Sequence, residues 1–531
     1  MNCDQVYLRS NALVEPLIDH WYAWTHLIPP ATCARNLTER HFKIMDSYIA
    51  APQVHASAVK NPKMLGGPFI DYDGQRVNEI KSLRAELSSR RDYLVALSKA
   101  LEDLDRMLQS QAKGESVHSL YAKVPEILKG YVELVYDLNN HPSFRLIEPL
   151  LYRSEFYRPD SQSLMLSQIS GDDRPFVLST PRLPQNNSVH MKLPFSDESI
   201  DHLFSAKLEP KPLQELTERC HISPEEIRAF QSLFTSEKPK SYARYQGTGA
   251  RWRYFGHACI LLETPTMSLL FDPVLSYTYD SGISRYTYDD LPDQIDYVVI
   301  THNHQDHVLL ETLLQIRHKV GCVVVPRSSG GTLADPSLKL MLETIGFRRV
   351  VELSEMETME LEAGSFMTGL TFMGEHADLD VRSKLAYLVD LRGNKLFFAA
   401  DSCNIEPTLY RHLHKHIGDV RALFIGMECD GAPLSWLYGP LLSRRMERAL
   451  DESRRLSGSN YAQAIEIVNL LNCKEVFVYA MGQEPWLNHV MSLKYTPDSN
   501  PIVQSNKLIE TCRERGMLAE RLFGEREMRL D

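Results

Sequence analysis

The stretch YVVITHNHQDH at residues 297–307 decides the fold. Its apolar first part, residues 297–300, is typical of a buried strand, and residues 308–318 have the apolar periodicity of a helix. A strand-to-helix turn presents its side chains at the carboxyl edge of a sheet, which is where α/β proteins place ligand sites. The residues of metal-binding type in this turn are His302, His304, Asp306 and His307.

Four such side chains so close together can serve two metal ions. His302 and His304 alternate toward one ion, and Asp306 and His307 turn toward its neighbour. The alternative is a polar turn in which Asp306 caps the helix and the histidines are incidental. Imidazoles crowded at one turn are unfavourable without a metal, so we predict a dinuclear metal site.

Later strand ends supply further candidate ligands. Asp401 follows the apolar run LFFAA and suits a carboxylate that bridges both ions. Glu375 and His376 follow another apolar run, and because adjacent residues on a strand point in opposite directions, spacing alone does not choose between them. Asp272, in LFDPVL, is expected to orient one of the histidines. An aspartate that starts a turn before proline explains Asp272 equally well.

Composition excludes several classes of protein. At 531 residues the chain is long enough for two to four domains of about 150 residues. The net charge of -11 argues against nucleic acid or an anionic membrane as a partner. There is no signal-peptide pattern and no apolar run approaching the roughly 20 residues of a membrane span. The nine cysteines form no C-x-x-C pair, so we expect reduced thiols and a cytoplasmic protein.

Two differently patterned parts meet at the polar segment 236–250. Residues 1–240 are predicted to form a helix-rich α/β domain. Its aliphatic stripe between Ile80 and Leu108 is either one face of a core helix or helical hairpin, which we favour, or a dimerisation seam. In residues 246–531 short strands alternate with helices, which predicts sheets covered by helices.

The motif His-x-His-x-Asp-His, with GHACILL, FDPVLS and AADS, resembles the metallo-β-lactamase superfamily over roughly residues 246–500. The resemblance implies an αββα sandwich. Hydrolases of this superfamily commonly use a third histidine on the first metal and a final histidine on the second. This sequence offers Glu375 or His376 at the first position and Ala480-Met481-Gly482 at the second. If Glu375 binds, the first metal has two histidines and one carboxylate, which suits non-haem iron.

The whole chain resembles the CmlA-type diiron β-hydroxylases of nonribosomal peptide and antibiotic biosynthesis. The resemblance rests on VEPLIDHWYAW, LIPPATCAR, MGEHADLDVRSK, LFFAADSCNIEPT and VYAMGQEPW. The N-terminal motifs matter because ordinary metallo-β-lactamases lack that domain. The implied ligands are His302, His304 and Glu375 for one iron and Asp306, His307 and Asp401 for the other.

The resemblance also implies a reaction. The family hydroxylates the β-carbon of an amino acid held as a thioester on a nonribosomal peptide synthetase carrier domain. It uses two iron ions, dioxygen and electrons from an external reductase or ferredoxin-type donor, and its N-terminal domain is involved in dimerisation. The alternative is a dinuclear zinc hydrolase of thioesters, lactones or phosphodiesters, with His376 as the third imidazole. A degenerate scaffold is a further alternative.

Other candidates lie close to the implied site in the sequence. Glu428 is either an additional carboxylate near the metals or an acid that supports their ligands. Trp436 and Tyr438 either line a substrate channel or pack before the Gly-Pro turn. Arg382 and Lys384 either meet the substrate or a carrier phosphate, or form an ion pair at the surface or beside the metals.

Overall fold

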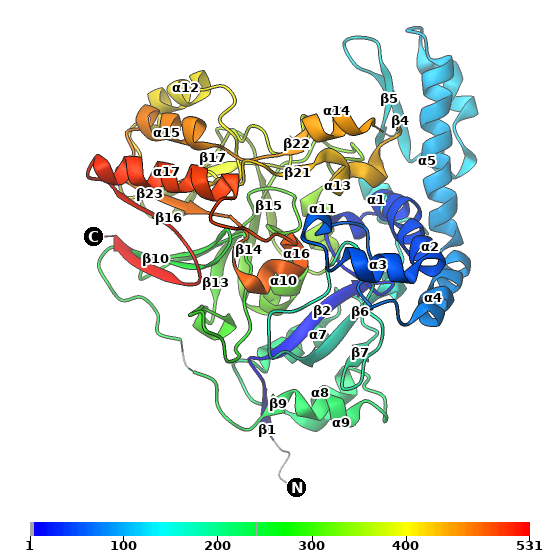
Figure 1. Cartoon of the computed structure of the whole chain (residues 1–531), viewed down its shortest axis with the longest axis horizontal. Coiled ribbons are helices and arrows are strands. Elements are labelled where there is room, and N and C mark those ends of the chain that lie inside the picture. The colour runs from blue at the N-terminus through cyan, green and yellow to red at the C-terminus, as the bar shows by residue number, and fades with distance from the viewer. Residues whose placement is uncertain (1–4, 241, 445, 531) are drawn as a thin grey trace.

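Two seven-stranded sheets form the centre of the C-terminal part in the computed structural model, which describes residues 5–240, 242–444 and 446–530 (Figure 1). The first sheet has the order β15-β14-β13-β12-β11-β10-β25, with bounds β10 Ala250–Gly256, β11 Cys259–Glu263, β12 Ser268–Phe271, β13 Ile295–Val299, β14 Val320–Pro326, β15 Val350–Leu353 and β25 Arg526–Leu530. The second has the order β16-β17-β18-β19-β20-β23-β24, with bounds β16 Thr358–Glu362, β17 Ser365–Leu370, β18 Ala386–Leu391, β19 Asn394–Phe398, β20 Ala422–Gly426, β23 Glu475–Tyr479 and β24 Leu518–Arg521.

Aromatic side chains join the facing surfaces of the two sheets. Phe271 of the first sheet stacks on Phe398 of the second, with ring centroids 4.1 Å apart. Trp252 of the first sheet meets Phe424 and Phe477 of the second edge-on, at 5.2 and 4.8 Å. All five side chains are buried. Strands buried on both faces read as continuous apolar runs, which explains the pattern of this half of the sequence.

Helices cover the outer faces. The second sheet is covered by α12 (Thr408–Ile417), α15 (Tyr461–Leu470) and α17 (Asn500–Glu514), which Figure 1 shows together beside β23. The first sheet is covered by α10 (Leu310–Ile316) and α11 (Leu338–Thr344), which share its outer core. The layers therefore run helix, sheet, sheet, helix. This arrangement confirms the predicted αββα fold class.

Shorter elements complete the C-terminal part between β20 and α17. They are β21 Ala432–Pro433, α13 Leu434–Tyr438, α14 Arg448–Ser453, β22 Arg455–Leu456 and α16 Asn488–Met491.

The N-terminal part is a separate mixture of helices and small sheets with the orders β8-β1-β9, β3-β2-β6-β7 and β4-β5. Its strands are β1 Gln5–Leu8, β2 Ala12–Ile18, β3 Trp21–Tyr22, β4 Val132–Tyr136, β5 Pro142–Leu146, β6 Gln162–Gln168, β7 Val189–Met191, β8 Lys211–Pro212 and β9 Phe234–Thr235. Its helices are α1 Pro30–Asn36, α2 Phe42–Ala50, α3 Pro52–Ala58, α4 Val77–Arg90, α5 Asp92–Gln111, α6 Glu148–Leu151, α7 Glu198–Ser205, α8 Leu213–Arg219 and α9 Ile227–Ser232. Within the described ranges no strand ladder joins the two parts, and the exact domain boundary stays a prediction.

The aliphatic stripe is split between α4 and α5 at Arg91. Arg91 is buried and pairs with Asp19 at 2.8 Å, which holds the break in place. The stripe is buried within the chain along its whole length, so it belongs to the core and is not free to form a dimerisation seam. Its members are Ile80, Leu83, Leu87, Leu94, Leu97, Leu101, Leu104 and Leu108.

Two further expectations concern the whole chain. Eight cysteines are free thiols, and Cys3 lies outside the described residues. Among the helices of the described ranges, none is long and apolar enough to cross a membrane.

A buried ionic network joins the two parts beside the metal motif. Arg174 donates to Glu15 of β2 at 2.8 Å and to Glu311 of α10 at 2.6 Å. The hydroxyls of Tyr22 and Tyr277 also donate to Glu311, each at 2.7 Å. Because α10 follows the turn that carries His307, this network fixes the helix behind the candidate ligands.

Replacing Arg174 by Met is expected to lower the free energy of unfolding by about 3–5 kcal/mol, because Glu311 then keeps only hydroxyl partners in a buried site. The measurement is the urea unfolding midpoint. Arg106→Met is the control: its exposed pairs on α5 contribute at most about 1 kcal/mol. Adding Glu311→Gln to Arg174→Met should recover part of the loss. Equal losses for Arg174→Met and Arg106→Met would contradict the prediction.

Candidate metal centre

The turn after β13 brings its four side chains together with two from later strand ends. His302 and His307 are fully buried, and His304 nearly so. Three groups of potential ligand atoms form, each with all atoms within 4.8 Å of one another. They are His302, His304 and Glu375; His302, His307 and Asp401; and His257, Asp306 and His307.

Glu375 faces two histidines at once. Its Oε1 lies 2.9 Å from His304 Nδ1, and its Oε2 lies 3.7 Å from His302 Nε2. Gly374 and Glu375 have φ angles of 75° and 67°, in the left-handed region that is uncommon for a non-glycine residue. This turn aims the Glu375 carboxylate at the imidazoles, and such backbone outliers gather at functional sites.

His376 also points into the site. On a regular strand it would point away from the site, because adjacent residues on a strand point in opposite directions. It lies in the turn after β17 and not on a strand, so the rule that separated it from Glu375 does not apply. Its Nε2 is 3.7 Å from Glu375 Oε2, and its Nδ1 shares a 2.7 Å hydrogen bond with the Tyr438 hydroxyl. The same hydroxyl lies 3.2 Å from His304 Nε2. Within the described part of the chain, the metal-sized groups include Glu375 and not His376.

His307 is held between two carboxylates. Its Nδ1 lies 2.8 Å from Asp272 Oδ2, and its Nε2 lies 3.1 Å from Asp401 Oδ2. Thr301 donates to Asp272 from both its backbone N–H and its hydroxyl, at 2.8 and 2.6 Å. The structure thus places Asp272 where it orients an imidazole and leaves the other ring nitrogen facing the site.

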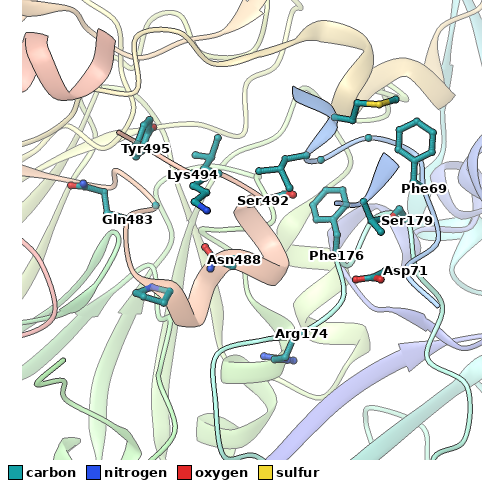
Figure 2. Close-up of a pocket in the computed structure, with 18 residues that line it drawn as sticks. Phe69, Asp71, Arg174, Phe176, Ser179, Gln483, Asn488, Ser492, Lys494 and Tyr495 are labelled. Atoms are coloured by element: carbon teal, nitrogen blue, oxygen red, sulfur yellow. The ribbon is translucent and has the colours of Figure 1, made fainter. Parts of the chain in front are cut away.

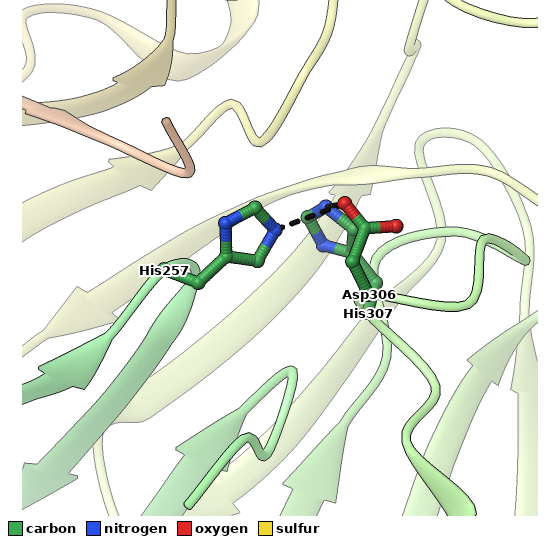
Figure 3. A group of neighbouring side chains, drawn as sticks. All are labelled: His257, Asp306 and His307. Atoms are coloured by element: carbon green, nitrogen blue, oxygen red, sulfur yellow. Dashed lines mark hydrogen bonds and ion pairs between the residues drawn. The ribbon is translucent and has the colours of Figure 1, made fainter. Parts of the chain in front are cut away.

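His257 also belongs to the site (Figure 3). The sequence analysis used its motif GHACILL only for the superfamily resemblance and did not predict His257 as a site residue. Its Nε2 lies 3.1 Å from Asp306 Oδ2, and the Gly482 N–H donates to its Nδ1 at 3.2 Å. Because Nδ1 accepts a hydrogen bond, the neutral ring carries its proton on Nε2 and donates it to Asp306. His257 therefore orients Asp306.

Burial and neighbouring charges set the protonation of the centre. Burial and the neighbouring His307 hold the pKa of His302 well below its usual range. Burial also opposes protonation of His307, yet Asp401, Asp306 and Asp272 raise its pKa well above the usual value. Burial raises the pKa of Glu375 to about 7 despite the nearby His304. A bound cation would favour the ionised carboxylates and the neutral imidazoles.

Buried polar atoms without partners test whether metal ions fit here. Buried polar groups are nearly always hydrogen-bonded, so several buried nitrogen and oxygen atoms without hydrogen bonds at one place need an explanation. Nitrogen and carboxylate oxygen atoms are the donors that iron and zinc bind, and cations between these side chains would satisfy them together. The unpaired atoms at this centre, among the residues the structure describes, are His302 Nε2, Glu375 Oε2, His376 Nε2 and Asp401 Oδ1.

Comparison with known proteins decides the family. The model of the "diiron non-heme beta-hydroxylase N-terminal domain" matches residues 7–239, and that of the beta-lactamase superfamily domain matches residues 268–434. The 4-amino-L-phenylalanyl-[CmlP-peptidyl-carrier-protein] 3-hydroxylase of Streptomyces venezuelae is 40% identical over 98% of this chain and 99% of its own. The chain belongs to the diiron β-hydroxylase family.

The crystal structure of CmlA, a diiron β-hydroxylase from Streptomyces venezuelae, superposes with a TM-score of 0.93 at 39% identity, covering 99% of each chain. A metal-dependent hydrolase of Bacillus velezensis is 25% identical over only 28% of this chain and 61% of its own. The likeness to the β-hydroxylase thus includes the N-terminal domain, and the zinc-hydrolase alternative is supported less.

The remaining candidates of this β-hydroxylase lie around the centre. Glu428 follows β20 outside the three metal-sized groups; burial and then Asp401 raise its pKa well above its usual value. Trp436 donates to the Gly66 carbonyl at 2.9 Å, so it packs between α13 and the N-terminal part.

The two basic candidates of the β-hydroxylase differ in position. Arg382 is 68% exposed and pairs with Asp380 at 3.3 Å. This is the surface ion pair that the sequence analysis gave as the alternative to contact with the substrate or a carrier phosphate. Lys384 donates to the Gly374 carbonyl at 3.1 Å and so supports the turn that presents Glu375.

Replacing His257 by Ala is expected to weaken iron binding by about 10- to 100-fold, because Asp306 loses the donor that orients it. The measurement is the iron retained per chain after challenge with a graded series of chelator concentrations. His257→Gln, which keeps an N–H donor, should retain more iron than His257→Ala. The exposed His412 of α12 supplies the control His412→Ala. Wild-type retention in His257→Ala would show that the hydrogen bond is dispensable.

Proposed function

We propose that this β-hydroxylase adds a hydroxyl group to the β-carbon of an amino acid held as a thioester on a nonribosomal peptide synthetase carrier protein. One observation carries the proposal: 40% identity over 98% of the chain to a relative named for the 3-hydroxylation of a 4-amino-L-phenylalanyl carrier protein. Position 3 of that aminoacyl group is its β-carbon. Aromatic amino acids are therefore the first substrates to try.

We propose that His302, His304 and Glu375 would hold one iron and that Asp306, His307 and Asp401 would hold the other. The unpaired buried nitrogen and oxygen atoms of this cluster support the assignment. When bound and reduced, the two irons would supply the activation of dioxygen that hydroxylation of a C–H bond requires, which protein side chains do not perform. Glu428 is proposed as a further carboxylate beside the pair.

The chain's own residues hold and shield these ligands. Asp272 accepts from His307 Nδ1 and thereby keeps Nε2 directed at the centre. Tyr438 is fully buried, and its hydroxyl contacts both His304 and His376. Its apolar ring covers this side of the candidate metal centre. Because the candidate ligands are buried, bulk water is kept from the reacting carbon. The chemistry assigns no separate nucleophile or acid–base residue.

Two electrons per turnover have to come from outside, since no further redox group is proposed in this chain. A reductase or a ferredoxin-type protein is the proposed donor. A homodimer formed through the N-terminal domain and a cytoplasmic location remain predictions from the sequence.

Protein reconstituted anaerobically with Fe(II) is expected to hold two irons per chain, as the diiron family requires. After chemical reduction and exposure to ¹⁸O₂, a 4-amino-L-phenylalanyl carrier protein should gain one labelled oxygen atom, measured by mass spectrometry of the intact carrier. Zinc-loaded protein is the control and should leave the carrier unchanged. Two tightly bound zincs with cleavage of the thioester would instead support the hydrolase.

Neighbouring variants separate the two candidate ligands of the first metal. Glu375→Gln is expected to lose most of its iron, because a neutral amide replaces the carboxylate that faces His302 and His304. His376→Gln should keep its iron. Metal content by elemental analysis, with the optical spectrum of the oxidised protein, checks both. The opposite order would make His376 the ligand, as in the zinc interpretation.

A further inference from the structure

A cavity of about 450 Å³ lies between the two parts of the chain (Figure 2). One wall comes from the N-terminal segments 64–71 and 174–179, and the other from residues 482–495, which we call the C-terminal wall. The cavity is separate from the three groups of candidate metal ligands, since it shares no residue with them.

The cavity is lined by polar atoms that lack partners. Arg174 Nε, Gln483 Oε1 and the Tyr495 hydroxyl are buried, and none makes a hydrogen bond within the described residues. Two of them can donate and one can only accept. A ligand that carries both amide N–H and C=O groups would satisfy all three.

The C-terminal wall is connected to the metal centre through Gly482. Gly482 lines the cavity, and its N–H holds His257, which in turn orients Asp306. Tyr495 also lines the cavity, and burial, followed by the charges of Glu428 and Asp401, raises the pKa of its hydroxyl. The cavity is therefore a neighbour of the reaction site.

An anion can bind at the Lys494 end of the cavity. The charged residues of the lining are Arg174, Lys494 and Asp71. Asp71 lies on the opposite, N-terminal wall, and the charge of Arg174 is already balanced by Glu15 and Glu311. Lys494 is exposed and makes no ion pair with the residues the structure describes. Figure 2 shows its ammonium group pointing toward Asn488 within the cavity lining.

We propose that this cavity binds the phosphopantetheine arm of the aminoacyl carrier protein, and the proposal rests on the function proposed above. A folded carrier cannot reach buried metal ligands, whereas an extended arm can. The arm's chemistry matches the lining: its phosphodiester anion would meet Lys494, and its amide groups would meet Gln483 and Tyr495. The aminoacyl thioester would then continue from the C-terminal wall toward Asp401.

Charge reversal at the rim gives the kinetic test. Lys494→Glu is expected to raise KM for the 4-amino-L-phenylalanyl carrier protein by about tenfold or more with kcat changed less than about twofold, because the ammonium binds the arm and not the reacting carbon. Lys494→Gln should lie between Lys494→Glu and the wild type. Lys192→Glu, at an exposed lysine outside the cavity lining, is the charge-matched control and should change neither constant.

A trapping experiment tests the same site without turnover. Ser492 lies on the C-terminal wall, so Ser492→Cys should exchange rapidly with a carrier protein whose phosphopantetheine thiol is activated as a pyridyl disulfide. The new cysteine thiolate attacks the arm's sulfur, the mixed disulfide forms and pyridinethione leaves. The controls are the wild-type chain, which reports its native cysteines, and Lys192→Cys.

The outcomes separate this inference from the proposed function. Trapping at Ser492→Cys at least about tenfold faster than at Lys192→Cys supports the arm site even if no carrier-bound amino acid is hydroxylated, which would defeat the proposed function alone. If the wild type hydroxylates the substrate, but Lys494→Glu leaves KM unchanged and Ser492→Cys reacts no faster than the controls, the arm does not bind here.

Discussion

The structure depends on the burial of several carboxylates and imidazoles at the end of β13. Glu375 and Glu428 have raised pKa values because burial and the other carboxylates disfavour their charge. Such a cluster is unfavourable by itself, since buried charge needs an opposite charge beside it. Cations resolve the conflict. The αββα sandwich provides the framework, because His307 in the turn after β13 and Asp401 in the turn after β19 lie 3.1 Å apart, measured from Nε2 to Oδ2. The fold is therefore arranged around its metal site.

The N-terminal part contributes to this arrangement. Arg174 binds Glu311 on the helix that follows the metal motif, and the same residue lines the cavity beside the C-terminal wall. Trp436 ties α13 to Gly66, and α13 also carries Tyr438, which contacts two histidines of the centre. The domain that distinguishes this family from ordinary metallo-β-lactamases thus braces the site and shapes its surroundings.

Sequence reasoning reached the parts of the site that are local. The turn of residues 302–307 and Asp401 could be predicted because each follows an apolar run that is recognisable as a buried strand. Polar residues at the carboxyl ends of such strands are expected to lie close together at the edge of the sheet. His257 could not, since its role depends on Asp306 and on the N–H of Gly482, which is 225 positions away. The orientation of Glu375 and His376 was equally hidden, because a left-handed turn replaced the expected strand.

At two positions where hydrolases of the superfamily commonly have a histidine ligand, this chain differs, and both differences favour carboxylate ligands over imidazoles. Where a final histidine is common in those enzymes, this chain has Ala480-Met481-Gly482, and the Gly482 N–H fixes the tautomer of His257. His257 then donates to Asp306 and leaves a carboxylate, not a further imidazole, directed at the centre. Together with Glu375, this makes the proposed ligand set half carboxylate. Anionic oxygen ligands stabilise the more highly charged iron that dioxygen reduction produces, so the proposed ligand set suits an oxidative iron site.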